Sequence, residues 1–539
     1  MTDPAAHGLV APATPPRHVG GPRTVAALLD APLADDPDGL ALVGRTGRFT
    51  FAELDAVVNR AAGALRALGV GPGDRVAMSL PNDVDLLIGF LGAMRLGAIW
   101  LGINRPLAGP EKAYLLADAG VGVLLATPEV GAELDPHRSD LPDLRELVVV
   151  DPAATRDRWR EVVAEADPSP PGVTIDPLAP AAIAYTSGTT GFPKGAVHTQ
   201  HNMLVPGMVS ATTGSATPGG VMGVALPLTI LNLIVLGPCL AYQCGHRLVA
   251  MDRIDAVGLA EWIAAEGITT FSAVPAMVHD LLTDDRVSDD MLASLDAIGV
   301  GGADMPDAFR RLYQERFGRR VGTGYGLTEA PTAVTVEDVE APAVPGSCGR
   351  ALPQVEIRIL DDEDRPRPAG EEGEVCVAPA TSGPFADVYR PMLGYWNRPE
   401  ATADALRDGV LHTGDIGVLD ADGNLTIRDR RNDLIIRGGA NVYPAEVERV
   451  LHDDPAVAAC AVIGVPDERL GERVVAYVQT ADGAHIDAEE LRTRCRGQLA
   501  AYKVPDTVTF VDGFDRTPMG KIRKTTLREQ AAAQAGSAS

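Results

Sequence analysis

The chain has 539 residues, of which 46% are hydrophobic and 22% charged, and its formal net charge is −26 at pH 7. This length exceeds what a single hydrophobic core serves, so two or more domains are expected. The acidic balance argues against nucleic acid as a partner and against docking on anionic lipid, because both need dense lysine and arginine.

The cysteines and the N-terminus indicate a cytoplasmic protein. Six cysteines without a CxxC pair are too sparse for a disulfide scaffold. Residues 1–23 are rich in Pro, Ala and Gly and lack the apolar core of a signal peptide, so we expect a flexible N-terminus. The uncharged stretch Val221–Gly245 is interrupted by Pro227 and Pro238, which favours a buried helix with flanking strands over a membrane span.

From Thr24 onward, helical patterns alternate with short apolar runs, which predicts βαβ units and a parallel sheet. The predicted helices in this part are Leu54–Leu68, Val84–Arg95, Ala113–Asp118, Asn202–Ser210 and Val257–Glu266. The predicted strands are Arg75–Ser79, Ile99–Leu101, Val121–Ala126, Ile183–Thr186, Val224–Leu226, His246–Val249, Thr269–Ala273 and Ala297–Val300.

From about Val344 the pattern changes to alternating strands separated by turns, which predicts a small antiparallel sheet or barrel. Its predicted strands are Val355–Leu360, Gly373–Val377, Gly417–Leu419 and Leu425–Ile427. Past Arg430 a compact α+β pattern follows, with helices Pro444–His452 and Asp487–Leu499 and strands Val457–Val465, Glu472–Thr480 and Thr507–Phe510.

The segment Tyr185–Gly195, reading YTSGTTGFPKG, is the strongest motif. Its glycines let backbone N–H groups approach phosphate oxygens, its hydroxyls add donors, and Lys194 supplies a cation. It differs from the usual P-loop because Pro193 precedes the lysine and Gly195 follows it. A mobile surface turn is the alternative, but the density of phosphate-binding residue types favours a nucleotide site.

Further motifs follow in order. They are Gly301–Ala303, Gly324–Glu329, Thr413–Asp415, Arg430–Glu448, Ala501–Pro505 and Pro518–Arg523. With the glycine-rich loop they resemble, from about Thr24 to Arg528, the adenylate-forming superfamily of acyl-CoA synthetases, peptide-synthetase adenylation domains and beetle luciferases.

This resemblance implies an α/β fold with a large N-terminal domain (24–430) of two βαβ-type subdomains plus a small β-barrel. A hinge (431–434), a small mobile α+β domain (435–530) and a flexible tail (531–539) complete the chain. It also implies ATP-dependent activation of a carboxylic acid to acyl-AMP with release of pyrophosphate, followed by transfer of the acyl group to a thiol.

The resemblance also implies residue roles. Lys521 is the adenylation lysine, Thr328 reaches the α-phosphate, and Glu329 holds Mg²⁺, an ion that prefers oxygen ligands. The β- and γ-phosphates are contacted by Thr186, Ser187, Gly188, Thr189, Thr190 and Lys194. The nucleoside is bound by the turns Gly301, Gly302, Ala303 and Gly324, Tyr325, Gly326, with Tyr325 on adenine and Asp415 and Arg430 at the ribose.

For the second step, the resemblance implies that the C-terminal domain rotates about a hinge and that a pantetheine arm passes Gly438, Gly439 and Ala440. The hinge position, normally Asp or Lys, is Asn432 here, which puts the rate of alternation in question and leaves the reaction class unaffected.

The acyl pocket is expected at Thr229, Ile230, Asn232, Ala273, Ala276 and Gly324. Small side chains leave room, so we expect a bulky aryl, alicyclic or medium-to-long-chain acid. The alternative is that other side chains fill this space.

Free CoA is the expected acceptor, because no carrier-protein segment follows Lys521, and a separate acyl-carrier protein is the alternative. A catalytically silent protein that only binds nucleotides or acyl-adenylates is a further alternative, disfavoured by intact Lys521, Glu329 and Lys194. The pair His198 and His201 is expected to be polar surface rather than a zinc site. A monomer and a homodimer are both compatible with the sequence.

Overall fold

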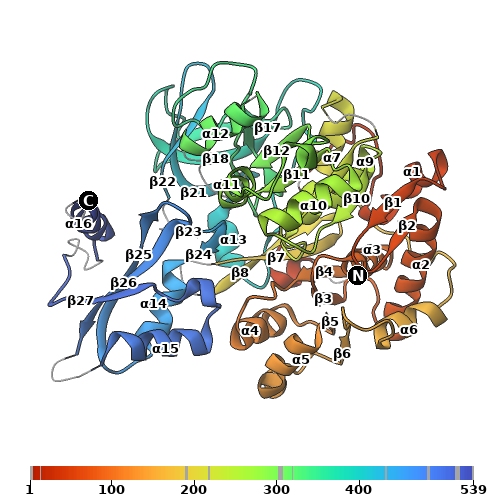
Figure 1. Cartoon of the computed structure of the whole chain (residues 1–539), viewed down its shortest axis with the longest axis horizontal. Helices are drawn as coiled ribbons and strands as arrows, with labels where there is room; N and C mark the ends of the chain where they lie inside the picture. The colour runs from red at the N-terminus through yellow and green to blue at the C-terminus, as the bar shows by residue number, and fades with distance from the viewer. Residues whose placement is uncertain are drawn as a thin grey trace.

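The computed structural model describes residues 4–12, 14–187, 192–215, 219–300, 307–318, 320–430, 434–481, 486–515 and 522–536. Figure 1 shows a large body formed by the chain up to β22 and a smaller unit, β23 to α16, at one side of it. We call these the large body and the C-terminal unit.

A mainly parallel sheet of seven strands, ordered β19-β8-β7-β4-β3-β5-β6, forms one part of the large body. Its strands are β3 (Arg75–Ser79), β4 (Ile99–Gly102), β5 (Val123–Ala126), β6 (Glu146–Val149), β7 (Pro180–Ser187), β8 (Pro193–Thr199) and β19 (Gly394–Tyr395). The connecting helices are α2 (Phe51–Ala67), α3 (Val84–Arg95), α4 (Gly109–Ala119), α5 (Pro128–Leu134) and α6 (Arg158–Glu165). Strands β8 and β19 are antiparallel to their neighbours, so they bring the end of the glycine-rich loop beside residues 394–395.

A second sheet of six strands has the order β12-β11-β9-β10-β1-β2, and its pairs are parallel except β1 with β2. Its strands are β1 (Leu40–Val43), β2 (Arg48–Thr50), β9 (Val221–Val224), β10 (Arg247–Ala250), β11 (Thr270–Ala273) and β12 (Ala297–Val300). The helices of this part are α7 (Gln200–Thr213), α8 (Leu231–Ile234), α9 (Leu240–Gln243), α10 (Ala256–Glu266), α11 (Pro275–Thr283) and α12 (Asp307–Phe317).

The uncharged stretch Val221–Gly245 forms β9 followed by helical segments whose side chains join the main hydrophobic core, as predicted. No helix within the described ranges combines the length and apolarity needed to cross a membrane.

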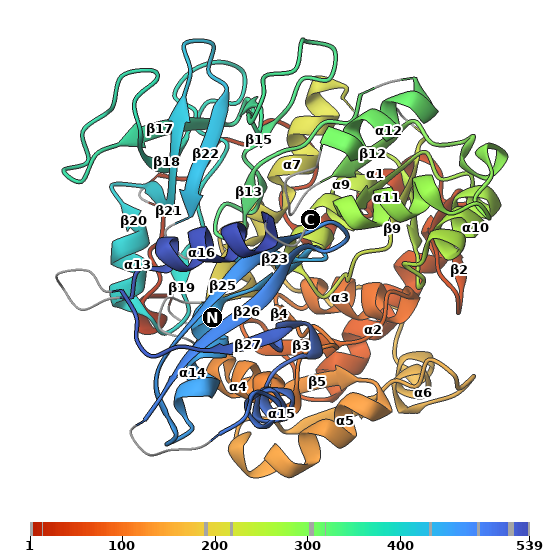
Figure 2. The ribbon, with the colours of Figure 1, turned by 60° about the vertical axis from the view of Figure 1, so that its left-hand side comes forward.

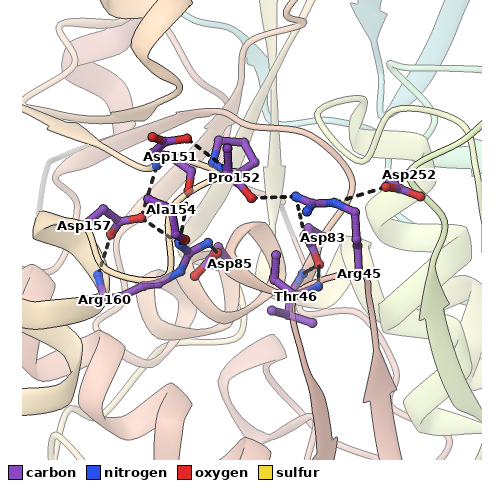
Figure 3. A network of polar contacts seen from close by, with 12 residues as sticks. Arg45, Thr46, Asp83, Asp85, Asp151, Pro152, Ala154, Asp157, Arg160 and Asp252 are labelled. Atoms are coloured by element: carbon purple, nitrogen blue, oxygen red, sulfur yellow. Dashed lines mark hydrogen bonds and ion pairs between the residues drawn. The ribbon is translucent and has the colours of Figure 1, made fainter.

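A network of ion pairs ties the two sheets together on the side where strands β1, β3, β6 and β10 end (Figure 3). Arg45, in the β1–β2 turn, lies 3.2 Å from Asp252 after β10 and 3.5 Å from Asp83 at the start of α3. Asp83 also accepts a hydrogen bond from the N–H of Thr46 and caps α3. The pair of Arg45 with Asp83 thus links the β1–β2 turn of the second sheet to the segment that follows β3 of the first sheet.

The small β-region is an open half-barrel. Its strands β17 (Val355–Leu360), β18 (Gly373–Pro379), β20 (Leu406–Arg407), β21 (Val410–Leu419) and β22 (Leu425–Arg430) pair in the order β17-β18-β21-β20, with β22 on β21. The long strand β21 carries the predicted ribose motif, so this sheet positions Asp415.

The C-terminal unit is a five-stranded sheet with helices on both faces. Its elements are β23 (Ile435–Arg437), β24 (Ala440–Val442), α14 (Pro444–His452), β25 (Val457–Asp467), β26 (Gly471–Thr480), α15 (Ala488–Gln498), β27 (Thr507–Phe510) and α16 (Lys524–Gly536). Helices α14 and α15 pack on one face, and α16 with Leu527 and Ile522 packs on the other, as Figure 2 shows for α16. Helix α15 contacts α4 of the large body, so the face carrying α14 and α15 is the docked face.

Candidate active site

The two ends of the glycine-rich loop lie beside Glu329. Thr186 pairs with Lys194 across strands β7 and β8. The Thr186 hydroxyl donates to Glu329 Oε1 at 3.0 Å, and the Tyr395 hydroxyl donates to the same oxygen at 2.8 Å. The Lys194 ammonium lies over the Tyr395 ring, 4.3 Å from its centroid. Three residues predicted from the sequence thus converge with one that was not predicted.

The electrostatics of this cluster suit a phosphate site. Burial lowers the pKa of Lys194, and the Glu329 carboxylate opposes that shift. Burial, together with Glu329, raises the pKa of Tyr395, so its hydroxyl remains a hydrogen-bond donor. The cluster supplies the Lys194 ammonium, which can bind anionic oxygens, and the Glu329 carboxylate, which accepts hydrogen bonds from two hydroxyls.

His198 fixes the backbone that carries Thr328 and Glu329. Its Nε2 donates to the Thr328 carbonyl at 2.8 Å, and burial lowers the pKa of this imidazole to about 4. His201 is also buried and donates to the Val388 carbonyl at 2.7 Å. The expectation that both histidines are polar surface is therefore wrong, because each is held in the core by a backbone carbonyl.

The predicted adenine and ribose residues touch each other. The Tyr325 hydroxyl donates to Asp415 Oδ2 at 2.7 Å. Gly324 lies against the Thr335 carbonyl, which an added Cβ would meet at 2.5 Å, so a side chain is excluded there. Gly326 begins the short strand β13 (Gly326–Leu327). These contacts hold the aromatic ring next to the carboxylate.

The Thr413–Asp415 turn is held from two sides. The Thr413 hydroxyl donates to the Val375 carbonyl at 2.6 Å, and Glu374 accepts from the Gly414 N–H at 3.0 Å. In the β21–β22 pairing, Asp415 lies opposite Arg430, of which the structure describes the backbone. Glu374, which supports the turn, was not predicted from the sequence.

Three of the predicted acyl-pocket residues, Ala273, Ala276 and Gly324, lie at one edge of the second sheet. Ala273 ends β11 and pairs with Val300 at the end of β12, and Val300 bridges to Thr323, which precedes Gly324. Ala276 follows in α11. The carboxyl ends of parallel strands thus collect these residues at one edge, where open α/β sheets bind ligands.

The segment with Thr229, Ile230 and Asn232 is clamped onto the first sheet. Gly102 allows close approach, because an added Cβ would meet the Thr229 carbonyl oxygen at 1.9 Å. The Asn82 side chain donates to the Leu226 carbonyl and accepts from the Leu228 N–H, each at 2.8 Å. Thr229 is buried, whereas Ile230 is 42% exposed. Asn82 is a further residue that the sequence patterns did not single out.

The predicted pantetheine turn reaches the same edge from the C-terminal unit. Gly438 and Gly439 connect β23 to β24, which Ala440 begins, and both have positive φ, +57° and +81°. A Cβ on Gly439 would meet the Val274 side chain at 2.4 Å, and Val274 directly follows Ala273. The turn is therefore in close contact with the predicted acyl pocket.

Several predicted residues fall outside the described ranges. They are Gly188, Thr189, Thr190, Gly301, Gly302, Ala303, Asn432 and Lys521, and for Ser187 the backbone alone is described. Ile522, directly after Lys521, packs beside Leu527 on the face of the C-terminal sheet opposite α14.

Comparison with known families identifies the family to which the chain is similar. The model of AMP-binding enzymes matches residues 29–396, and that of the AMP-binding enzyme C-terminal domain matches residues 446–521. The chain is 38% identical over 487 residues to a feruloyl-CoA synthase of Amycolatopsis sp., covering 89% of this chain and 94% of that protein.

Two solved structures are similar over almost the whole chain. A fatty acyl CoA synthetase of Mycobacterium tuberculosis has 32% identity and a TM-score of 0.70, covering 95% of this chain and 99% of that one. An o-succinylbenzoate CoA synthetase double mutant from Bacillus subtilis, bound with a product analogue, has 30% identity and a TM-score of 0.81, covering 93% and 98%.

The chain therefore belongs to the family of AMP-binding enzymes, that is, to the adenylate-forming superfamily. Within that superfamily it is an acid–thiol ligase that forms an acyl-adenylate and transfers the acyl group to CoA.

Proposed function

We propose that this protein uses ATP and Mg²⁺ to convert a bulky carboxylic acid into its CoA thioester, with the residue roles given below. The observation that carries the proposal is the convergence of Thr186, Lys194 and Glu329, within one α/β body that also joins Tyr325 to Asp415. One cluster suits the phosphates and the other suits the nucleoside of ATP.

In the first step, a carboxylate oxygen of the acid attacks the α-phosphorus, the bond to the β-phosphate oxygen breaks, and pyrophosphate leaves. Positioning and charge neutralisation dominate such a reaction. Lys194 and the hydroxyl of Thr186 bind the leaving phosphates, Thr328 contacts the α-phosphate, and Lys521 aligns the carboxylate with it.

Glu329 fits a magnesium ion, because it places a carboxylate beside the proposed phosphate site, and Mg²⁺ is usually held by one or two carboxylates together with substrate phosphates. When bound, Mg²⁺ supplies neutralisation of phosphate charge. Asp415 accepts hydrogen bonds from the ribose hydroxyls, and Tyr325 packs on adenine.

The acid is proposed to be aryl, alicyclic or medium-to-long-chain. The support for this is that Ala273 and Ala276, at the edge where the predicted pocket lies, carry small side chains. The relatives act, by their names, on ferulate, fatty acids and o-succinylbenzoate, all of which are larger than acetate.

In the second step, the CoA sulfur attacks the acyl carbonyl carbon, the bond from that carbon to the AMP phosphate oxygen breaks, and the thiol proton passes to solvent. The turn at Gly438–Gly439 lies where a thin pantetheine arm would enter. Because Ile522 packs on the face away from the docked surface, we propose that Lys521 acts in a second docking of the C-terminal unit.

An acid panel tests the proposal. Pyrophosphate release is measured with ATP, Mg²⁺ and each acid, with and without CoA, and thioester is detected in parallel. Acid-dependent release that becomes acyl-CoA formation is expected, and bulky acids are expected to exceed acetate. Release without thioester on CoA would indicate a carrier protein instead, and no release across a broad panel would contradict the proposed activity.

The Lys521→Ala variant tests the division between the two steps. We expect acyl-adenylate formation to fall sharply while thioester formation from supplied acyl-adenylate is retained. An equal loss of both half-reactions would refute the role of Lys521.

A further inference from the structure

A buried ion cluster joins the C-terminal unit to the large body, and none of its members belongs to the phosphate or nucleoside cluster. The Lys503 ammonium lies 2.6 Å from Glu111 in α4 and 2.8 Å from Glu446 in α14. The side chains of Lys503 and Glu446 are each 6% exposed and that of Glu111 is 12% exposed. The cluster therefore places one cation between two carboxylates, one from each side of the docking surface.

Glu111 accepts backbone hydrogen bonds in addition to its ion pair with Lys503. Its Oε2 accepts the N–H of Ala108 at the start of α4 at 2.8 Å and the N–H of Ala500 from the C-terminal unit at 2.7 Å. As the third residue of α4, Glu111 also lies at the positive end of the helix dipole. One carboxylate thus caps its own helix and receives two donors from the other unit.

The charge state of Lys503 suits an interface that can open and close. Burial lowers the pKa of Lys503, but Glu446 and Glu111 more than offset this and the net shift is upward. Lys503 is consequently a cation when docked. Breaking a buried pair by removing one partner is costly, because it leaves an uncompensated charge out of water.

The same docking brings the C-terminal unit onto the glycine-rich loop and the acyl pocket. Arg449 of α14 lies over the ring of Phe192, 4.7 Å from its centroid, and Tyr114 of α4 packs against that ring at 5.1 Å. On the same docked face, Gly439 meets Val274.

We propose that Lys503 and Glu111 form a latch that holds the C-terminal unit in the docking used for thiol transfer. The inference rests on the proposed two-step function. Both are positioning residues: neither touches the reacting atoms, and they act by keeping the Gly438–Gly439 turn against Val274. Acyl-adenylate formation, which uses the other docking, does not need them.

The test separates the two half-reactions. Acid-dependent pyrophosphate–ATP exchange measures adenylation, and single-turnover conversion of supplied acyl-adenylate with CoA measures thiol transfer. We expect Lys503→Met to slow thiol transfer by on the order of 30-fold or more while exchange stays within about twofold. Lys503→Arg, which keeps the charge, is expected to recover part of the loss.

A matched control lies on the same helix. Lys112, the residue after Glu111, pairs with Glu133 of α5 at 2.5 Å, entirely within the large body. Glu133→Gln therefore removes an ion pair from α4 without touching the docking surface, and it is expected to leave the ratio of the two half-reactions unchanged. Glu111→Gln is expected to change that ratio in the direction of Lys503→Met.

A measurement without catalysis completes the test. Hydrogen exchange of the peptides around Ala108 and Ala500 is expected to be faster in Lys503→Met than in the wild type, with α5 unaffected. Unchanged hydrogen exchange in Lys503→Met, or equal loss of both half-reactions, overturns the latch. Absence of acid-dependent pyrophosphate exchange in the wild type would instead refute the proposed function. The hydrogen-exchange measurement would still decide whether the latch exists.

Discussion

The contact between Gly439 and Val274 predicts a variant that is defective in one half-reaction alone. In Gly439→Ala, the new methyl carbon would meet Val274 Cγ1 at 2.4 Å, Cβ at 2.8 Å and Cγ2 at 2.9 Å. Because both methyl groups and the Cβ are too close, no rotamer of Val274 relieves the overlap. Restoring ordinary carbon contacts requires the turn to retreat by about 1 Å.

Gly438→Ala is the matched comparison. Its φ of +57° imposes a similar backbone penalty, of about 1–2 kcal/mol, but its Cβ would meet only Leu470 of the same unit, at 3.6 Å. The difference between the variants therefore isolates the contact across the docking surface. Overpacking costs about 1–3 kcal/mol, so Gly439→Ala is expected to lose roughly 5- to 150-fold more in thiol transfer.

The assay is single-turnover formation of acyl-CoA from supplied acyl-adenylate, beside pyrophosphate–ATP exchange. We expect exchange to be retained in both variants, and we expect Val274→Ala to restore part of the thiol transfer lost in Gly439→Ala. Equal thiol-transfer rates in the two glycine variants would refute the reasoning, as would a parallel loss of exchange in Gly439→Ala.

Three further predictions concern the large body. Tyr395→Phe keeps the ring beneath Lys194 but removes the hydrogen bond to Glu329, so the ATP or Mg²⁺ concentration for half-maximal exchange is expected to rise about tenfold; an unchanged value would contradict the role of this hydroxyl. Asp415→Asn is expected to raise the KM for ATP about 10- to 100-fold with a smaller change in kcat, measured by exchange, and a change confined to kcat would contradict ribose binding. Because the pKa of His198 falls from near 6.5 to about 4 on folding, the unfolded state binds the proton first as pH falls. The contribution of neutral His198 to the free energy of unfolding is therefore complete above pH 6.5 and declines by up to about 3 kcal/mol towards pH 4. The melting temperature of the wild type is expected to drop more between pH 7 and pH 5 than that of His198→Gln. Equal drops would contradict this role of His198.

Local sequence patterns predicted the elements well because their causes are local. Helix α3 and strand β17 have the predicted bounds, since apolar periodicity and flanking turns set both. Helix α4 begins at Gly109, four residues before its predicted start, because Pro110 and the cap formed by Glu111 extend it. The predicted small barrel is an open half-barrel, because closure depends on strand pairing across long separations.

By itself, the sequence determined the class of chemistry: a glycine- and hydroxyl-rich loop with a lysine, followed by an acidic residue and a ribose motif, marks an ATP-using enzyme of this superfamily. Tertiary structure decided what surrounds those residues. Tyr395 reaches Lys194 only because β19 pairs with β8, and the pKa of His198 is lowered because the imidazole is buried behind Thr328. Lys503 and Glu111 are 392 positions apart, and their pairing depends on how one folded unit docks on another. Such contacts have no local signature, because they arise from packing between segments that the chain itself does not bring together.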